Sequence, residues 1–304
     1  MSREDVEFSG PGGATLRGWF YAAAGPEPRP CVVLQHGFSA VKEMYLDDYA
    51  EAFRAAGVSC LVYDHPGFGA SDAVPGTPRQ EIDPWQQVRG VQDAITHASL
   101  REDVDEHRIG VWGSSYGAGN AYVTAAIDHR VTVVAGQVPF ISGPATFEAL
   151  VGPDAQVLDL CARDRRARVH GADPLTVPAV AETAVGQAMP GEGAYRWFTT
   201  AHTERAPSWL NEVTARSLEI MRGWEPAVYF PRITVPLLMV VAPEDELTAS
   251  DVALTAFEQA RSPKRLVRLP GGHFDAYTGE QFTQSSAAAA DWFAEHLVNA
   301  PIPV

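Results

Sequence analysis

The chain of 304 residues lacks the features that mark several classes of protein. No segment approaches the roughly 18 uninterrupted apolar residues of a membrane-spanning helix, and the polar N-terminus has no signal-peptide core. Cysteine is scarce. The chain has three, an odd number, and they lack the spacing of a disulfide framework: Cys31, Cys60 and Cys161. We therefore expect buried free thiols in a cytoplasmic protein with no membrane partner.

Positive charge is also in short supply. The 23 lysine and arginine residues are outnumbered by 38 acidic residues, which gives a formal net charge of −15 and a pI near 5.0. So acidic a chain is poorly suited to bind nucleic acid, and we expect a small-molecule substrate of little charge. No His, Cys, Asp or Glu residues have metal-ligand spacing, and no G-x-G-x-x-G motif follows the first strand. Neither a metal nor a dinucleotide cofactor is expected.

What the sequence does contain is a series of short apolar runs separated by helical patterns. After a predicted N-terminal hairpin, runs typical of buried strands occupy residues 31–35, 58–63, 108–112, 131–138, 235–241 and 266–269. Helical patterns occupy residues 44–56, 85–98, 118–127 and 281–298. Strands that alternate with helices predict an α/β fold with a parallel, doubly wound sheet.

The pattern changes over residues 143–229, where apolar strands disappear. Helices are expected there at residues 156–168, 180–188, 193–203 and 210–222. We predict that residues 1–142 and 230–304 form the core domain and that 143–229 form a helical cap inserted after the sixth strand. The aromatic residues of this cap either form its own small core or offer an apolar pocket to substrate. The candidates for substrate contact are Trp197, Trp209, Trp224 and Tyr229. A homodimer through the cap or the last strand is an alternative to a monomer.

The most informative stretch is Gly113-x-Ser115-x-Gly117, between an apolar run and a helix of small residues. This strand–turn–helix setting is typical of a nucleophile elbow. The tight turn would push Ser115 out above the sheet edge, where only glycine fits two residues before and after it. The helix would direct its positive N-terminus at an oxyanion formed there. The alternative is an ordinary turn capped by serine; Ser114 lacks the flanking glycines.

Polar residues follow two later strands, and together with Ser115 they make a catalytic constellation. Asp245 follows the strand at 235–241, and His273 follows the strand at 266–269. Because the carboxyl ends of parallel strands share one edge, we expect a nucleophile, an acid and a base to meet there. Three other acidic residues compete for the acid's role: Glu244, Glu246 and Asp251.

Two backbone N–H groups are candidates for an oxyanion hole. His36-Gly37-Phe38 follows the strand at 31–35, and Tyr116 follows the predicted nucleophile. The N–H groups of Phe38 and Tyr116 would both point at the developing negative charge. His36 itself is expected to be a structural hydrogen-bonding residue rather than a base.

Together these residues resemble the α/β-hydrolase family. The resemblance is carried by His36-Gly37-Phe38, by the turn from Asp64 to Ser71, by Gly113-x-Ser115-x-Gly117, by Asp245 and by Gly272-His273-Phe274. It implies an eight-stranded, mostly parallel sheet flanked by helices, and chemistry through an acyl-enzyme. The strings around Ser115 and His273 are similar to a microbial branch that includes polyketide-tailoring acyl transferases and hydrolases and relatives of dienelactone hydrolase.

The function predicted from the sequence is therefore that of a serine hydrolase. It would cleave an ester, thioester, lactone or activated amide of a small to medium apolar substrate. The same triad would also serve an acyltransferase or a carbon–carbon bond hydrolase. A hydrolase-like receptor that binds ligand without turnover is a non-enzymatic alternative.

Overall fold

The computed structural model describes residues 3–25, 28–150, 155–182, 186–261 and 263–299. Its centre is an eight-stranded sheet in the order β1-β2-β4-β3-β5-β6-β9-β10. The strands are β1 (Glu4–Ser9), β2 (Thr15–Tyr21), β3 (Arg29–Gln35), β4 (Ser59–Tyr63), β5 (Val104–Ser114), β6 (Val131–Gln137), β9 (Leu237–Val241) and β10 (Lys264–Arg268). Within this sheet, the described pairs β1–β2 and β2–β4 are antiparallel and the other pairs are parallel. The predicted eight-stranded, mostly parallel α/β sheet is confirmed.

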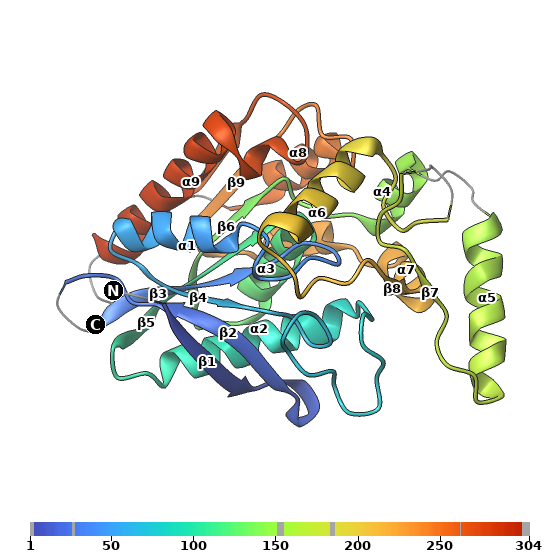
Figure 1. Cartoon of the computed structure of the whole chain (residues 1–304). Helices are drawn as coiled ribbons and strands as arrows, with labels where there is room; N and C mark the ends of the chain where they lie inside the picture. Colours follow the sequence, from blue (N-terminus) through green and yellow to red (C-terminus); the bar gives the residue numbers. More distant parts are fainter. Residues whose placement is uncertain (1–2, 26–27, 151–154, 183–185, 262, 300–304) are drawn as a thin grey trace.

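Helices cover both faces of this sheet (Figure 1). One face packs against α1 (Leu46–Ala55) and α9 (Gly279–Phe293), the other against α2 (Pro84–Ser99), α3 (Tyr116–Ile127) and α8 (Ser250–Gln259). The division follows from the two-residue period of a strand, because neighbouring side chains point to opposite faces. In β3, for example, Val32 and Leu34 join the core beneath α1, whereas Cys31 and Val33 join the core beneath α2.

The segment between β6 and β9 is largely helical, as predicted, but its details differ. It contains α4 (Gly143–Leu150), α5 (Ala155–Val169), β7 (Thr176–Val177), α6 (Glu192–Glu204), β8 (Val213–Thr214), α7 (Ala215–Arg222) and the 3-10 helix η2 (Pro226–Arg232). The helices expected at 156–168 and 193–203 are confirmed. The sequence pattern missed α4 and the two-stranded pairing of β7 with β8.

Two predicted helices of this segment are wrong in whole or in part. The described residues of 180–188 are not helical, and the N–H groups of Ala188 and Met189 donate to the carbonyls of Pro178 and Ala179. The helix expected at 210–222 begins only at residue 215. Asn211 holds the preceding turn through side-chain hydrogen bonds to the backbone N–H and C=O of Val180. Thr214 then caps α7 by accepting a hydrogen bond from a backbone N–H.

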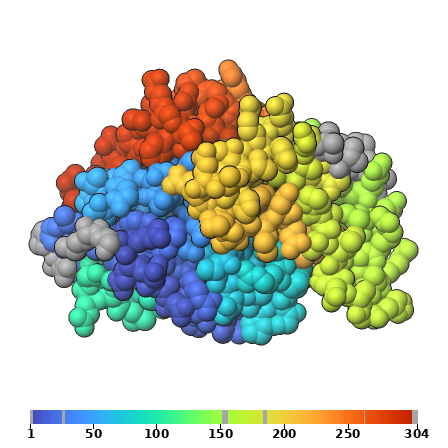
Figure 2. All heavy atoms as spheres, in the orientation of Figure 1, coloured from blue at the N-terminus to red at the C-terminus, as the bar shows by residue number. Residues whose placement is uncertain are grey.

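The segment packs over the edge of the sheet that carries the strand carboxyl ends. Its atoms in α6, yellow in Figure 2, lie beside those of α1. Arg205, at the end of α6, forms ion pairs with Asp47 and Asp48 of α1, and Trp209 Nε1 donates to the carbonyl of Ser39 at 2.9 Å. Helix α5 stands out from the rest of the molecule (Figure 1). The division into a core domain and a cap domain stays a prediction.

Three expectations from composition can be compared with the structure. Cys31, Cys60 and Cys161 are buried free thiols, as predicted. Within the described ranges, no helix has both the length and the apolar character needed to cross a membrane. Over the same residues, no group of three or more His, Cys, Asp or Glu side chains is arranged to hold a metal ion.

Candidate active site

Ser115 lies at the turn between β5 and α3, in a backbone conformation that few residues other than glycine adopt. Its φ is 58° and its ψ is −123°. It directly precedes the first turn of α3. The neighbouring glycines are required by close backbone contacts. A Cβ at Gly113 would lie 2.2 Å from the carbonyl oxygen of Gly117, and one at Gly117 would lie 2.5 Å from that of His36. Glycine is thus required at both positions, as predicted, but because a side chain would collide with neighbouring backbone atoms.

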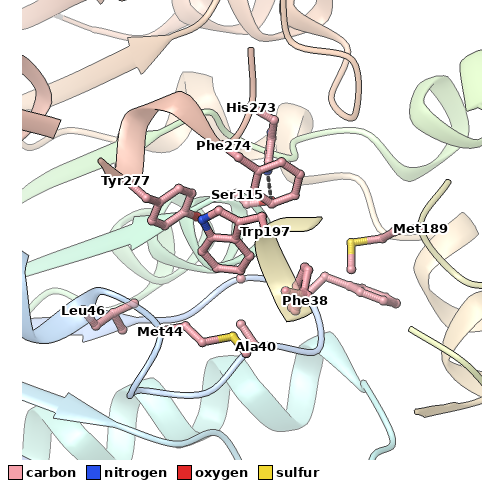
Figure 3. A pocket seen from close by; sticks show the side chains of 12 residues that line it. Phe38, Ala40, Met44, Leu46, Ser115, Met189, Trp197, His273, Phe274 and Tyr277 are labelled. Atoms are coloured by element: carbon pink, nitrogen blue, oxygen red, sulfur yellow. Dashed lines mark hydrogen bonds between the residues drawn. The ribbon is translucent and has the colours of Figure 1, made fainter. Parts of the chain in front are cut away.

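The structure brings Ser115, His273 and Asp245 together in a hydrogen-bonded series. His273 Nε2 lies 3.0 Å from Ser115 Oγ, the bond drawn as a dashed line in Figure 3. His273 Nδ1 lies 2.7 Å from Asp245 Oδ2. This ring bond goes to Asp245 and not to the competing acids Glu244 or Glu246. The imidazole is thereby fixed with one nitrogen toward the carboxylate and the other toward the hydroxyl.

Asp245 is held in its ionised form. Burial by itself would raise the pKa of this carboxyl, but attraction to His273 and the hydrogen bond from its ring oppose burial. Further hydrogen bonds come from the backbone N–H groups of Leu247 and Thr248, each at 2.8 Å, and from the Thr248 hydroxyl. The net effect is a pKa below the ordinary value for Asp245. A carboxylate so placed can stabilise a protonated His273 during a reaction.

The loop after β3 lies directly against the nucleophile. A Cβ at Gly37 would be 3.3 Å from the Cβ of Ser115. The N–H of Phe38 and the N–H of Tyr116, which is the first residue of α3, have no hydrogen-bond partner within the part of the chain that the structure describes. Neither N–H group is used within these residues, and the positive end of α3 lies at Ser115.

His36 has a structural role, as its sequence context predicts. Its Nε2 accepts a hydrogen bond from the backbone N–H of His65 at 3.0 Å, so its Nδ1 carries the proton and donates to the carbonyl of Gly37 at 3.0 Å. Burial lowers the pKa of His36, which keeps the ring neutral. These bonds join the loop after β3 to the loop after β4.

A second link between the same two loops was missed by the sequence analysis. Lys42 and Asp64 form a buried ion pair, with 2.5 Å between Nζ and Oδ2. Asp64 also accepts the backbone N–H groups of Lys42 and Ala70, at 2.7 and 2.9 Å. The available signals were a lysine six residues after His36 and an acid at a strand end. Neither feature identifies the other as its partner.

Two cavities border Ser115 on either side of Phe38 and Met189. The smaller contains about 350 Å³ of empty space, part of it open to solvent, and is lined by His273 and by the aromatic rings of Trp197, Phe274 and Tyr277 (Figure 3). The larger contains about 550 Å³, also partly open to solvent, and its lining does not include His273. Its walls are mainly apolar and come largely from the segment between β6 and β9: Phe140, Phe147, Leu150, Leu218 and Met221. A ligand attached at Ser115 has two separate spaces to occupy.

Only one of the four aromatic residues proposed for substrate contact lines these cavities. Trp197 forms a wall of the smaller one and stacks on Phe274, with 5.0 Å between ring centroids. Trp209 is buried between Phe198 and the Ser39 carbonyl. Trp224 is buried against Trp85, which also contacts Tyr229. These last three side chains pack within the segment or against the core, because their rings find apolar partners there.

A family model and several characterised proteins match most of this chain. The model of the family described as "Alpha/beta hydrolase family" matches residues 32–284. The chain is 32% identical over 286 residues to a thiohydrolase of Eupenicillium brefeldianum, a match that covers 92% of this chain and 90% of that protein. It is 31% identical over 306 residues to the polyketide transferase af380 of Aspergillus fumigatus, covering 98% and 99%.

A comparison of structures agrees with these relatives. The structure of DcsB in complex with its substrate analogue superimposes on this chain with a TM-score of 0.84. The two share 27% sequence identity, and the match covers 98% of this chain and 100% of that one. The similarity therefore includes the segment between β6 and β9 as well as the sheet.

Proposed function

The chain belongs to the alpha/beta hydrolase family, and on this premise we propose that it is a serine hydrolase that cleaves an ester or thioester of an apolar acyl group. The observation that carries the proposal is the hydrogen-bonded series from Asp245 through His273 to Ser115. The relative named as a thiohydrolase supports hydrolysis and favours a thioester as the bond that is cleaved.

The proposed reaction follows from the geometry around Ser115. His273 Nε2 takes the proton of Ser115 Oγ as this oxygen attacks the substrate carbonyl carbon, and Asp245 stabilises the resulting imidazolium. The N–H groups of Phe38 and Tyr116 donate hydrogen bonds to the negatively charged oxygen of the tetrahedral intermediate. His273 then gives its proton to the leaving group, whose bond to the carbonyl carbon breaks. Water, deprotonated by His273, hydrolyses the acyl-enzyme and restores Ser115.

The positions of the two cavities suggest which part of the substrate each one holds. The leaving group must lie near His273 because it accepts a proton from Nε2, and the smaller cavity is the one that His273 lines. The acyl group then extends into the larger cavity, past Leu218 and Met221. Its mainly apolar wall favours an acyl group with little polar character beyond the reacting carbonyl.

Acyl transfer is the second candidate, and relatives named polyketide transferases favour it. The aromatic rings around His273 would limit access of water to the acyl-enzyme, so that a bound alcohol or amine could take the acyl group instead. Product analysis with a series of nucleophiles separates the two reactions. Hydrolysis alone in the presence of good acceptors would exclude transfer.

The test of the proposed function is labelling with a fluorophosphonate, which reacts with activated serine hydroxyls. We expect one label per chain at Ser115 by peptide mapping, and none in Ser115→Ala. Ser99→Ala is the matched control, because Ser99 donates only to the Ile95 carbonyl on α2. Absence of label from the wild-type protein, or label retained in Ser115→Ala, would refute the proposal. A series of acyl thioesters and matched oxyesters then identifies the preferred bond.

A further inference from the structure

Ser114, which precedes the proposed nucleophile, is completely buried and belongs to a hydrogen-bonded network. Its hydroxyl oxygen lies 2.5 Å from the phenol oxygen of Tyr277 and accepts a hydrogen bond from Gln137 Nε2 at 3.1 Å. The main chain of Gln137 takes part as well, because its carbonyl accepts the N–H of Ser115 at 2.9 Å. The elbow is therefore held by side-chain and backbone bonds to β6.

The same network reaches the loop that carries His273. Tyr277 lies four residues after His273, at the end of the 3-10 turn η3 (Asp275–Tyr277). The carbonyl of the preceding residue, Ala276, lies 2.6 Å from the phenol oxygen of Tyr49 on α1. Tyr49 also lies 2.8 Å from Gln137 Oε1 and 2.7 Å from the hydroxyl of Ser285 on α9. Gln137 thus connects the histidine loop back to Ser114.

These bonds form a closed circuit around the two loops. It runs from Ser114 to Tyr277, along the backbone to Ala276, and through Tyr49 and Gln137 back to Ser114. The single phenol proton of Tyr49 is shared between the Ala276 carbonyl and Gln137 Oε1. No side chain in it is more than 5% exposed. Burial raises the pKa of both tyrosines, so both phenols remain protonated. A buried network of this kind resists rearrangement, since each broken bond would leave a polar group without water.

We propose that Ser114 and Tyr277 are positioning residues, which hold the serine elbow and the histidine loop at the separation that brings Ser115 Oγ to His273 Nε2. This role rests on the proposed function. Neither hydroxyl touches the reacting atoms, so each acts through the backbone of its loop. Because a misplacement near 1 Å can cost about 100-fold in rate, loss of one bond that joins the two loops should cost about tenfold.

The variants Tyr277→Phe and Ser114→Ala break the same bond from its two ends. The first keeps the ring, which lines the smaller cavity and contacts Trp197 at 4.8 Å between centroids, so binding there is preserved. The measurement is the rate of fluorophosphonate labelling against reagent concentration, which separates binding from the chemical step. We expect each single variant to lower the chemical rate constant about tenfold with little change in binding. The double variant should react no more slowly than the slower single one.

The matched control is Tyr122→Phe, which removes a buried phenol that donates to the Leu238 carbonyl at 2.9 Å on the opposite face of the sheet. It should lower the thermal midpoint as much as Tyr277→Phe does but leave the labelling rate unchanged. Wild-type rates in Tyr277→Phe and Ser114→Ala, or effects that add in the double variant, would overturn the positioning role. Wild-type protein that takes no label would instead refute the proposed function. Should one single variant not fold, the other tests the same bond.

Discussion

Replacement of Lys42 by methionine is expected to destabilise the fold strongly, because it leaves a buried carboxylate without its cation. The Asp64 side chain is fully buried and that of Lys42 is only 6% exposed. Removal of one partner from a buried ion pair typically costs about 3–5 kcal/mol. At about 2 °C per kcal/mol for a chain of this size, the thermal midpoint should fall by about 6–10 °C. Methionine keeps most of the volume, so the loss reports the charge, including the contact of Lys42 Nζ with the Trp19 ring at 4.9 Å to its centroid.

The assay is thermal unfolding near neutral pH, followed by the fluorescence of a dye that binds exposed apolar surface. Arg54→Met is the control, because Arg54 pairs with a Glu51 side chain that is 49% exposed. Exposed pairs contribute at most about 1 kcal/mol, so this midpoint should fall by no more than about 2 °C. A midpoint for Lys42→Met that matches the control would refute the reasoning. Lys42 and Asp64 would then have to be hydrated rather than sealed from water.

Three further predictions concern the preferred acyl chain, the rate of the reaction and the pH dependence of stability. Leu218→Trp should fill part of the larger cavity and lower kcat/KM for long acyl chains at least about tenfold relative to short ones, whereas Leu218→Met, which conserves volume, should not. If the tryptophan variant kept the wild-type preference for chain length, the proposal that the acyl group binds in this cavity would be wrong. Asp245→Asn should lower kcat about 10⁴-fold, because the amide cannot hold His273 in the required tautomer. The folded-state pKa of Asp245 is lowered, so its ionised form stabilises the fold above the ordinary value of about 3.9 and this contribution is lost as the pH falls further. The difference in thermal midpoint between wild type and Asp245→Asn should therefore shrink below about pH 4; a constant difference would contradict the lowered pKa.

The parallel sheet could be predicted because its signals are local. Short apolar runs such as 31–35 and 237–241 are buried on both faces, and their length and apolar character are typical of central strands. The helices between β6 and β9 were harder to predict, since neighbouring segments decide their limits. The run at 180–188 has a helical pattern, yet its backbone bonds to the turn at Pro178 and to Asn211 instead.

In the candidate site, too, the residues with local sequence signals could be predicted, and the contacts between distant segments could not. Ser115, Asp245 and His273 each follow a strand of one parallel sheet, and that topology alone brings their loops to a common edge. The bond between Ser114 and Tyr277 joins residues 163 positions apart. Serine and tyrosine are common in cores, so neither residue type marks such a bond in the sequence. The pair of Lys42 and Asp64 could not be predicted either: Asp64 lies in the turn from Asp64 to Ser71, but nothing in the sequence marks Lys42 as its partner.

The elements that hold the proposed catalytic residues differ from those that line the larger cavity. The hydrogen bonds that hold the three proposed catalytic residues come from the sheet, its loops and α1: from Leu247 and Thr248 to Asp245, and through Gln137 and Tyr49 to the loops of Ser115 and His273. Phe140, just after β6, adds a backbone bond to the Ser115 carbonyl at 3.0 Å, whereas the described residues from α4 to η2 contribute none. The segment between β6 and β9 contributes most of the wall of the larger cavity instead, including Leu218 and Met221. Substitutions in that wall can therefore alter which acyl group fits while the geometry between Ser115 and His273 stays as it is.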